Sequence, residues 1–367
     1  MNDKKRFNGM RRLSFHVKEM FHPTQSSAGR LRAFKNAVMT GSDLIANKKH
    51  VVTVGGGTGT FVVLSALKDL PSVTLSAIVS VADDGGSTGR LRDAYGFIPP
   101  GDARQALVAL AKEGTMLRDM FTYRFSKGDI AGHNLGNLFL TALRDRLGSE
   151  GAAITAASEI LRVKGYVVPI SERPATLVAT LSTGEKVAGQ HALNARGAGN
   201  GHVESLGIAE DLTVSKHAKK AIESADMIIL GPGDLYTSTL ANFAVPGLTE
   251  SVGRSRSTLV YFVNLFTNAS ETDGYSAKKH LEEITRYAGR KPDVIFMHSG
   301  ALPQHIRDYY AKKKGYPVVD DLGDDPTVIR GSFADVVVIP KVETDAIDRS
   351  LIRHDPKKVA EAIKKIL

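Results

Sequence analysis

The stretch "HVVTVGGGTGTFVVLSALKDL" at residues 50–70 decides the fold class of this chain. Its β-branched run at 50–54 predicts a buried strand, and the periodic apolar residues that follow the glycines predict a helix. Between the two elements stands a glycine-rich loop made of Gly55, Gly56, Gly57, Thr58 and Gly59. Strand, glycine-rich loop and helix in this order aim backbone N–H groups and the positive end of a helix dipole at one point, which favours a bound anion.

This loop leaves two interpretations open. It can cradle a ligand phosphate, or it can be a tight turn whose glycines let chain segments pack closely. The spacing differs from the dinucleotide fingerprint, because G-x-G-x-x-G counted from Gly55 needs a glycine at 60, where Thr60 stands. A nicotinamide-dependent oxidoreductase is therefore disfavoured.

The remainder of the chain alternates in the same way, which is typical of an α/β protein. Further apolar runs that predict strands lie at 75–81, 226–230, 258–265, 293–299 and 335–340. Near-continuous apolar runs suit a mostly parallel sheet with helices on both faces. Between 167 and 215 the pattern changes, and "ATLVATLSTGEKVAGQHAL" predicts an antiparallel hairpin within a small β-rich insertion. The last segment predicts a helix with Asp355 as its N-cap.

The net charge of +9 is concentrated at one end of the chain. Residues 1–49 hold eleven Lys and Arg against three Asp and Glu, so they carry eight of the nine net positive charges. We expect residues 1–49 to be a flexible basic extension and 50–367 to be a single domain. Such an extension is either solvated or contacts an anionic surface or a partner. We expect no specific nucleic-acid partner, because the rest of the chain is nearly neutral.

Composition also bounds the chemistry. The 367 residues are 42% hydrophobic, enough for a sizeable core, and no apolar run approaches the length of a membrane span. We therefore expect a cytoplasmic protein. Zero cysteines exclude disulfides, thiolate nucleophiles and cysteine-bound metal. We expect neither NAD, haem nor zinc.

The loop after the second predicted strand, "SVADDGGSTGRLRDAYG" at 80–96, carries acids. Asp83 and Asp84 at the carboxyl end of a strand suit a ribose hydroxyl or a Mg²⁺ that neutralises a diphosphate. Arg90 can meet phosphate oxygens directly, and Ser87 and Thr88 add hydroxyls. The alternative is a helix capped by Ser87 with a flexible entry.

Two later loops repeat the theme. In "YRFSKGDIAGHNLGNL" three polar residues lie at a predicted helix start: His133, Asn134 and Asn137. They either bind a carbonyl or hydroxyl group of a ligand or cap the helix. In "DMIILGPGDLYTS" backbone and hydroxyl donors again follow a strand: Gly231, Gly233, Tyr236, Thr237 and Ser238. Several such loops after successive parallel strands favour a ligand, because packing alone needs no such accumulation. No nucleophile elbow, metalloprotease helix or Walker lysine is present.

Taken in order, "GGGTGTF", "ADDGGSTGRLRD", "PPGDARQALVAL", "GHNLGNL", "GPGDLYTS" and "RHDP" resemble the gluconeogenesis factor (YvcK-like) family. That family is related to 2-phospho-L-lactate transferase (CofD-like), and the resemblance runs from about residue 50 to the C-terminus. It implies a Rossmann-like body that binds a UDP-sugar or another nucleotide diphosphate. For gluconeogenesis factors the implied ligand is UDP-N-acetylglucosamine, and for the transferase relatives Mg²⁺ is implied as cofactor.

The resemblance also assigns residues. It places ligand contacts on the four loops above, a sugar-nucleotide tyrosine on Tyr310 with Tyr309 as the alternative, and an arginine on Arg353. One departure is Asp234, which stands where the family has a small hydroxyl residue. A carboxylate beside a phosphate repels it unless a metal ion or an arginine intervenes.

The resulting prediction is a regulatory protein that binds UDP-N-acetylglucosamine, acts in cell shape and envelope synthesis under gluconeogenic growth, and forms a homodimer. The alternative is a Mg²⁺-dependent transferase of the 2-phospho-L-lactate transferase type that uses a nucleotide-diphosphate-linked donor. Its metal ligands would be Asp83 and Asp84, since phosphoryl-type chemistry proceeds by positioning and charge neutralisation without a nucleophilic side chain.

Overall fold

The computed structural model of the protein describes residues 48–84, 86–95, 100–199, 201–336 and 351–367. The chain divides into two units, 1–40 and 41–367, and every described residue belongs to the second. The basic extension predicted for 1–49 lies outside the described residues apart from its last two. Within the described part, no helix is both long and apolar enough to cross a membrane.

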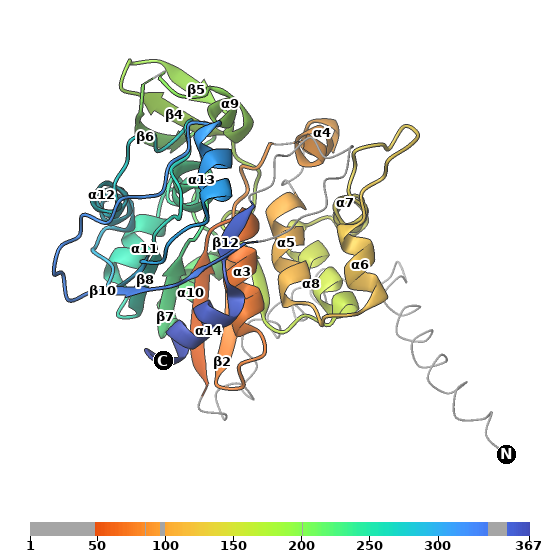
Figure 1. Ribbon diagram of the computed structural model, residues 1–367. Coiled ribbons are helices and arrows are strands. Elements are labelled where there is room, and N and C mark those ends of the chain that lie inside the picture. Colours follow the sequence, from red (N-terminus) through yellow and green to blue (C-terminus); the bar gives the residue numbers. More distant parts are fainter. Residues whose placement is uncertain (1–47, 85, 96–99, 200, 337–350) are drawn as a thin grey trace. The chain divides into compact units, whose positions relative to one another are not determined.

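A seven-stranded parallel sheet forms the centre of the fold (Figure 1). Its order is β10-β9-β8-β7-β1-β2-β3, and each neighbouring pair is parallel. The strands are β1 Lys49–Val54, β2 Val73–Val79, β3 Tyr166–Pro169, β7 Met227–Leu230, β8 Thr258–Phe262, β9 Val294–His298 and β10 Val328–Gly331. The predicted α/β class with a mostly parallel sheet is confirmed.

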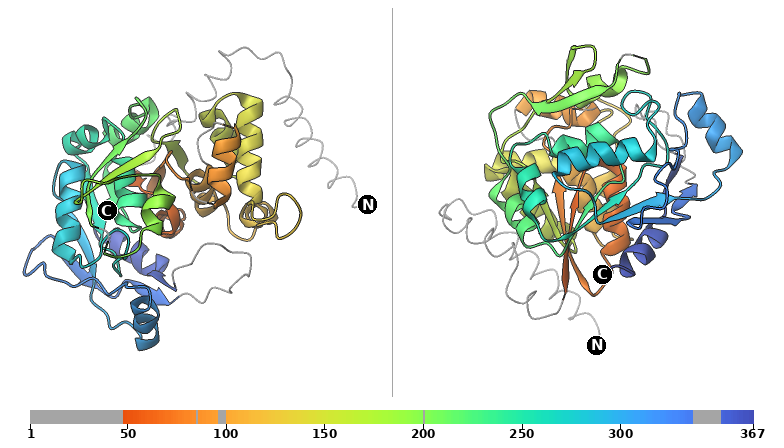
Figure 2. Two further views of the ribbon diagram at one scale, coloured as in Figure 1. Left: turned by 90° about the horizontal axis from the view of Figure 1, so that it is seen from above. Right: turned by 90° about the vertical axis from the view of Figure 1, so that its left-hand side faces the viewer.

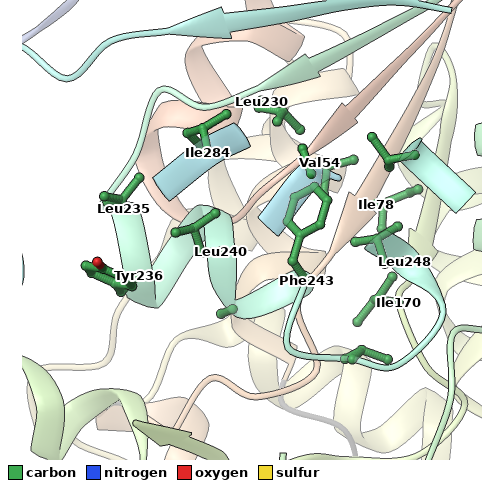
Figure 3. Packing of buried hydrophobic residues seen from close by; sticks show 14 of the residues in the cluster. Val54, Ile78, Ile170, Leu230, Leu235, Tyr236, Leu240, Phe243, Leu248 and Ile284 are labelled. Atoms are coloured by element: carbon green, nitrogen blue, oxygen red, sulfur yellow. The ribbon is translucent and has the colours of Figure 1, made fainter. Parts of the chain in front are cut away.

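Both faces of the sheet are buried, because successive side chains of a strand point to opposite faces. On β1, Val51 packs into one core and Val52 into the other, and on β7 Ile229 and Ile228 divide in the same way. One core is covered by α10 Lys216–Glu223, α11 Leu248–Arg254 and α12 Ala277–Ala288 (Figure 3). The other is covered by α3 Gly57–Leu67, α5 Pro100–Leu110, α7 Leu135–Leu147, α8 Glu150–Leu161 and α14 Pro356–Lys364.

Shorter helices complete this part of the chain. They are α4 Gly86–Tyr95, α6 Met116–Thr122, α9 Gln190–Ala195, α13 Gln304–Ala311, a π-helical turn η1 Leu235–Thr239 and a 3₁₀ turn η2 Leu240–Asn242. Helix α14 has the predicted N-cap, since Asp355 Oδ1 accepts from Lys357 N at 2.7 Å. Its buried Val359 and Ile363 pack in the core that α3 also covers.

The predicted insertion is a three-stranded antiparallel sheet in the order β5-β4-β6, with α9 between β5 and β6 in the chain. The strands are β4 Leu177–Leu181, β5 Lys186–Ala188 and β6 Val203–Ile208. It lies beyond one end of the large sheet in Figure 1 and in the right-hand view of Figure 2. The insertion begins later than the predicted residue 167, because β3 pairs with β2 in the large sheet.

Of the strand predicted at 335–340, the described residues 335 and 336 do not join the large sheet. Residues Ala334–Val336 form β11, which pairs antiparallel with β12 Ile352–His354, and 337–340 lie outside the described residues. The edge strand at this end of the large sheet is β10. Its residues are only partly buried, so its sequence shows no clear alternation of apolar and polar residues. Local apolar content therefore predicted a strand at 335–340 but could not predict its sheet partner.

The chain changes direction between β1 and β7. It runs outward from β1 through β2 to β3, then returns to the other side of β1 and continues from β7 to β10. Ligands of open α/β sheets bind outside the carboxyl ends of the strands at such a switch point. The loops after β1 and β7 therefore meet where a site is expected.

Candidate functional site

A cavity of about 730 Å³ lies at this switch point. Its walls come from the loops after β1, β7 and β8, from α13 with the residues after it, from β12, and from α9 of the insertion. The predicted residues that line it are Gly57, Thr58, Gly59, Gly233, Asp234, Ser238, Tyr310 and Arg353. Lining residues that the sequence did not single out include Asn194, Asn264, Phe266, Asn268 and Lys313.

The glycines after β1 allow close packing of neighbouring segments, and some of them also line the cavity. A Cβ at Gly59 would lie 1.6 Å from the carbonyl oxygen of Pro232, and one at Gly56 would lie 2.4 Å from Asp102 Oδ2. These two glycines therefore let the loop after β7 and helix α5 approach the backbone closely. Gly57 adopts a φ of +64°, which favours glycine, and it lines the cavity.

Carboxylates of the protein itself already accept hydrogen bonds from some of the N–H and hydroxyl groups that were predicted to bind an anion. The amide of Gly57 donates to Asp102 Oδ1 at 2.9 Å. After β7, the amide of Tyr236 donates to Glu271 Oε2 at 2.8 Å, and the Thr237 hydroxyl donates to Glu271 Oε1. An added ligand anion must therefore use other donors, of which the amides of Thr58 and Gly59 stand in the first turn of α3.

Asp102 and Glu271 were not among the predicted site residues. Asp102 belongs to the quoted "PPGDARQ" motif, where an acid in the first turn of a helix was the available signal. Glu271 lies in the loop after β8 and carried no local signal, because its partners stand 34 and 35 residues earlier.

Both acids hold a proton more tightly than usual. Burial and the nearby charge of Asp83 raise the pKa of Asp102 to about 7, against the opposing effect of the Gly57 amide. Burial and the charge of Asp234 raise the pKa of Glu271 to about 8, although its hydrogen bonds from Thr237 and Tyr236 lower it. We therefore expect the carboxyl groups of Asp102 and Glu271 to take up protons near neutral pH.

The two acids predicted as metal ligands point to different neighbours. A Cβ at Gly101 would lie 2.1 Å from Asp83 Oδ2, so Asp83 faces the start of α5 and Asp102. Asp84 Oδ1 instead accepts from the amide of His191 in α9 at 2.8 Å. Over the described ranges, no group of three or more His, Cys, Asp or Glu is placed to hold a metal ion. Asp83 and Asp102 suit Mg²⁺, which needs only one or two carboxylates when ligand phosphates complete its shell.

A second polar cluster joins α4 to α7, and none of its members lines the cavity. Ser87 Oγ lies 3.1 Å from His133 Nδ1, and Asn137 Nδ2 donates to Thr88 Oγ1 at 3.2 Å. Asn134 caps α7, since its Oδ1 accepts from Gly136 N at 2.9 Å. Burial and the cations of two arginines lower the pKa of His133, so its ring is neutral at pH 7.

The arginines around this cluster complete its contacts. Arg90 Nη2 donates to the carbonyl of Ala131 at 3.3 Å, and Arg104 Nε donates to Asn137 Oδ1 at 2.8 Å. The structure thus brings the predicted residues of α4 and α7 together, with the helix-capping alternative realised for Asn134.

The side chain of Tyr236 points away from the cavity. It is fully buried in the core drawn in Figure 3, and its hydroxyl lies 3.1 Å from the hydroxyl of Tyr275. Thr237 is also buried, with its hydroxyl on Glu271. Gly231 lies at the carboxyl end of β7, and a Cβ there would be 3.3 Å from the carbonyl oxygen of Phe262.

Aromatic residues line another part of the cavity, which is called the aromatic wall below. Tyr310 stacks on Phe266 with ring centroids 4.2 Å apart, and its hydroxyl accepts from Leu351 N at 3.2 Å. Lys313 Nζ donates to the hydroxyl of Tyr309 at 2.6 Å. Both tyrosines named as alternatives therefore line the same wall, next to Arg353 of β12.

Comparison with known proteins agrees with this architecture. The family model of 2-phospho-L-lactate transferase CofD matches residues 51–334. A gluconeogenesis factor of Halalkalibacterium halodurans is 38% identical over 318 residues, covering 86% of this chain and 96% of that protein. The gluconeogenesis factor of Bacillus subtilis is 35% identical over 326 residues, covering 88% of this chain and 99% of that protein.

Solved structures show the same fold. The crystal structure of a UPF0052 family member from Bacillus halodurans superimposes with a TM-score of 0.79 at 36% identity, covering 86% of this chain and 99% of that one. The resemblance drawn from the sequence motifs is thereby confirmed, and the chain belongs to the gluconeogenesis factor family, with a CofD-type domain over most of its length.

Proposed function

We propose that this protein is a regulatory protein that binds UDP-N-acetylglucosamine in the switch-point cavity and acts in cell shape and envelope synthesis during gluconeogenic growth. The observation that carries the ligand class is the cavity itself, whose volume of about 730 Å³ lies within the range of small-molecule sites. The names of the relatives support the regulatory role, since they describe gluconeogenesis factors.

The chemistry of the walls supports a nucleotide diphosphate. Tyr309 and Tyr310 offer aromatic surface to a pyrimidine ring. Arg353 and Lys313 place two cations in the same cavity, where a diphosphate needs them. The first turn of α3 adds the N–H donors of Thr58 and Gly59.

Isothermal titration calorimetry with UDP-N-acetylglucosamine tests the proposal. Arg353→Ala should weaken binding about tenfold or more, because a charge-assisted hydrogen bond to phosphate is lost. Arg307→Ala is the matched control, since Arg307 lies on α13 outside the cavity and contacts Gln304. Saturating ligand that gives neither heat nor a thermal shift with the unmodified protein would refute the proposal.

A paired substitution separates the ring of Tyr310 from its hydroxyl. Tyr310→Phe keeps the stacking on Phe266 and loses the hydroxyl contact with Leu351, so binding should stay within about threefold of the unmodified protein. Tyr310→Ala removes the ring and should weaken binding about tenfold. Equal affinities for the two variants would show that the aromatic wall does not contact the ligand.

A Mg²⁺-dependent transferase that uses a nucleotide-diphosphate-linked donor is the second candidate. Two observations favour it: the match to the transferase family model and the convergence of Asp83 with Asp102 beside the loop after β1. Those two carboxylates would hold the ion, which would neutralise the diphosphate of the donor.

Turnover of GDP- and UDP-linked donors with and without Mg²⁺ tests this candidate. Asp102→Asn should abolish metal-dependent turnover, whereas Asp119→Asn on the exposed face of α6 should leave it unchanged. The absence of product over the whole donor panel would count against the transferase.

A further inference from the structure

Asp234 occupies an N-cap position but does not cap. It precedes η1 with φ −54° and ψ 132°, and its side chain makes no capping hydrogen bond. An aspartate at this position ordinarily accepts from the amides two and three residues later. Those amides belong to Tyr236 and Thr237.

Glu271 explains why. Its Oε2 accepts from Tyr236 N at 2.8 Å and from Thr237 N at 3.4 Å, so the amides that Asp234 would cap are already filled from the loop after β8. Glu271 is only 2% exposed, and the two carboxylates repel each other, as the raised pKa of Glu271 reflects. Asp234 is thereby turned outward, where it lines the cavity.

The outward carboxylate is held in one orientation. Asn268 Oδ1 accepts from the amide of Ser270 at 3.0 Å, which directs its Nδ2 to Asp234 Oδ1 at 3.3 Å. Asp234 Oδ1 is therefore an acceptor, and Oδ2 presents further lone pairs to the cavity. Among the residues that the structure describes, Asp234 forms no ion pair.

Such a group suits a hydroxyl-bearing part of the ligand. A carboxylate next to the glycine-rich loops repels phosphate, but it accepts strong hydrogen bonds from hydroxyl groups. Asp234 is the one carboxylate side chain among the described residues that line the cavity, so it offers too few ligands to a metal ion bound by protein alone.

We propose that Asp234, held by Asn268, is the specificity-determining residue that reads a sugar hydroxyl of the ligand in this cavity. The proposal rests on the proposed function, since it requires that a nucleotide diphosphate binds there. The hydroxyl belongs either to the ribose or to the hexose, and the choice of probes distinguishes the two.

Calorimetric titrations with UDP, 2′-deoxy-UDP and UDP-N-acetylglucosamine test it on the full chain. For a ribose contact, the unmodified protein should bind UDP about tenfold or more tightly than 2′-deoxy-UDP, and Asp234→Ser should bring this ratio close to one. For a hexose contact, the preference for UDP-N-acetylglucosamine over UDP should collapse instead. Ratios are the readout because removing the charge also relieves repulsion of the diphosphate, which shifts all affinities together.

Two further variants keep the result interpretable. Asp234→Asn retains an acceptor oxygen and should retain part of the ratio, and it serves if Asp234→Ser does not fold. Asp273→Asn removes one carboxylate from an adjoining hollow of about 210 Å³, outside the residues that line the cavity, and should leave both ratios unchanged.

The outcomes separate this inference from the proposed function. Binding of UDP with both ratios unchanged in Asp234→Ser would overturn the inference alone. Binding that requires Mg²⁺ only while Asp234 is present would also overturn it, in favour of a metal contact. No binding of any probe to the unmodified protein would refute the proposed function itself.

Discussion

In the loops after β1 and β7, backbone amides at the start of a helical turn donate to carboxylates from other segments, but the two carboxylates differ. Each loop ends in a helical turn whose first amides lack partners within the helix, and each receives an acid from another segment. Asp102 comes from α5, accepts from Gly57 alone and has Asp83 as its neighbour. Glu271 comes from the loop after β8. It accepts hydrogen bonds from the amides of Tyr236 and Thr237 and from the Thr237 hydroxyl.

The two acids differ in how many of their oxygens accept hydrogen bonds. Glu271 is 2% exposed and its oxygens are filled by three donors from one short segment, so it fixes the backbone after β7. Asp102 is 9% exposed and has one amide partner on one oxygen, with a second acid at hand.

Removal of Glu271 should give the largest effect. Glu271→Ala leaves two amides and a hydroxyl without their acceptor in the interior, which should lower the free energy of unfolding by about 4 kcal/mol. Glu271→Gln keeps an acceptor and should cost about 1 kcal/mol. Urea unfolding measures both, and a Glu271→Ala protein as stable as the unmodified one would remove the distinction between the two acids.

The next largest effect should come from the point where the two loops touch. Gly59→Ala places a Cβ 1.6 Å from the carbonyl oxygen of Pro232, so the backbones must separate, at a cost of about 3 kcal/mol. Gly207→Ala is the control, because a Cβ there meets nothing within 4 Å. Equal midpoints of thermal unfolding for the two variants would contradict the close approach.

The pH dependence of stability should then distinguish the acids. A carboxyl whose pKa is raised in the folded state binds its proton more tightly than in the unfolded chain, so stability falls as pH rises from the unfolded to the folded pKa. For Asp102 this window runs from about 4 to about 7, and for Glu271 it extends to about 8.

Asp102→Asn should therefore flatten the fall of the free energy of unfolding between about pH 4 and about pH 7 by up to about 1.4 kcal/mol per pH unit. Glu271→Gln should change the slope up to about pH 8. Chemical unfolding at half-unit intervals from pH 5 to 8.5 measures this, and identical slopes for the two variants would show that the loops titrate alike.

The smallest effect should be at Asp84. Its hydrogen bond to His191 fixes the start of α9, which has no side-chain cap of its own. Asp84→Ala should cost about 1 kcal/mol and raise the amide hydrogen exchange of His191, while Asp84→Asn keeps the acceptor and should restore protection. Unchanged exchange in Asp84→Ala would show that the insertion is held by other contacts.

Much of the fold followed from local pattern. The β-branched run at 50–54 and the glycines after it predicted β1 and α3, and the change to alternation placed at 167–215 predicted the insertion, whose first strand β4 begins at Leu177. Within the stretch predicted as a strand at 335–340, the described residues 335 and 336 do form part of β11, but β11 pairs with β12 rather than joining the large sheet. Sheet partnership is a long-range property that an apolar run does not encode.

The site was predicted at the level of loops and less well at the level of side chains. Gly57, Asp234, Tyr310 and Arg353 line one cavity, yet Tyr236 faces the core because alternate residues of a helical turn cannot all point the same way. Asp84, predicted beside Asp83, instead contacts an insertion more than a hundred residues away.

By itself, the sequence determined the α/β class, the family and the loops at the carboxyl ends of the strands, because hydrophobic period, glycine clusters and motif order are local properties. Only the tertiary structure decided which acids fill the backbone amides. Gly57 and Asp102 are 45 residues apart, and Tyr236 and Glu271 are 35 apart, so their pairing depends on how α5 and the loop after β8 pack against the sheet. That packing also accounts for Asp234 lining the cavity, since Glu271 already accepts from the amides that Asp234 would otherwise cap.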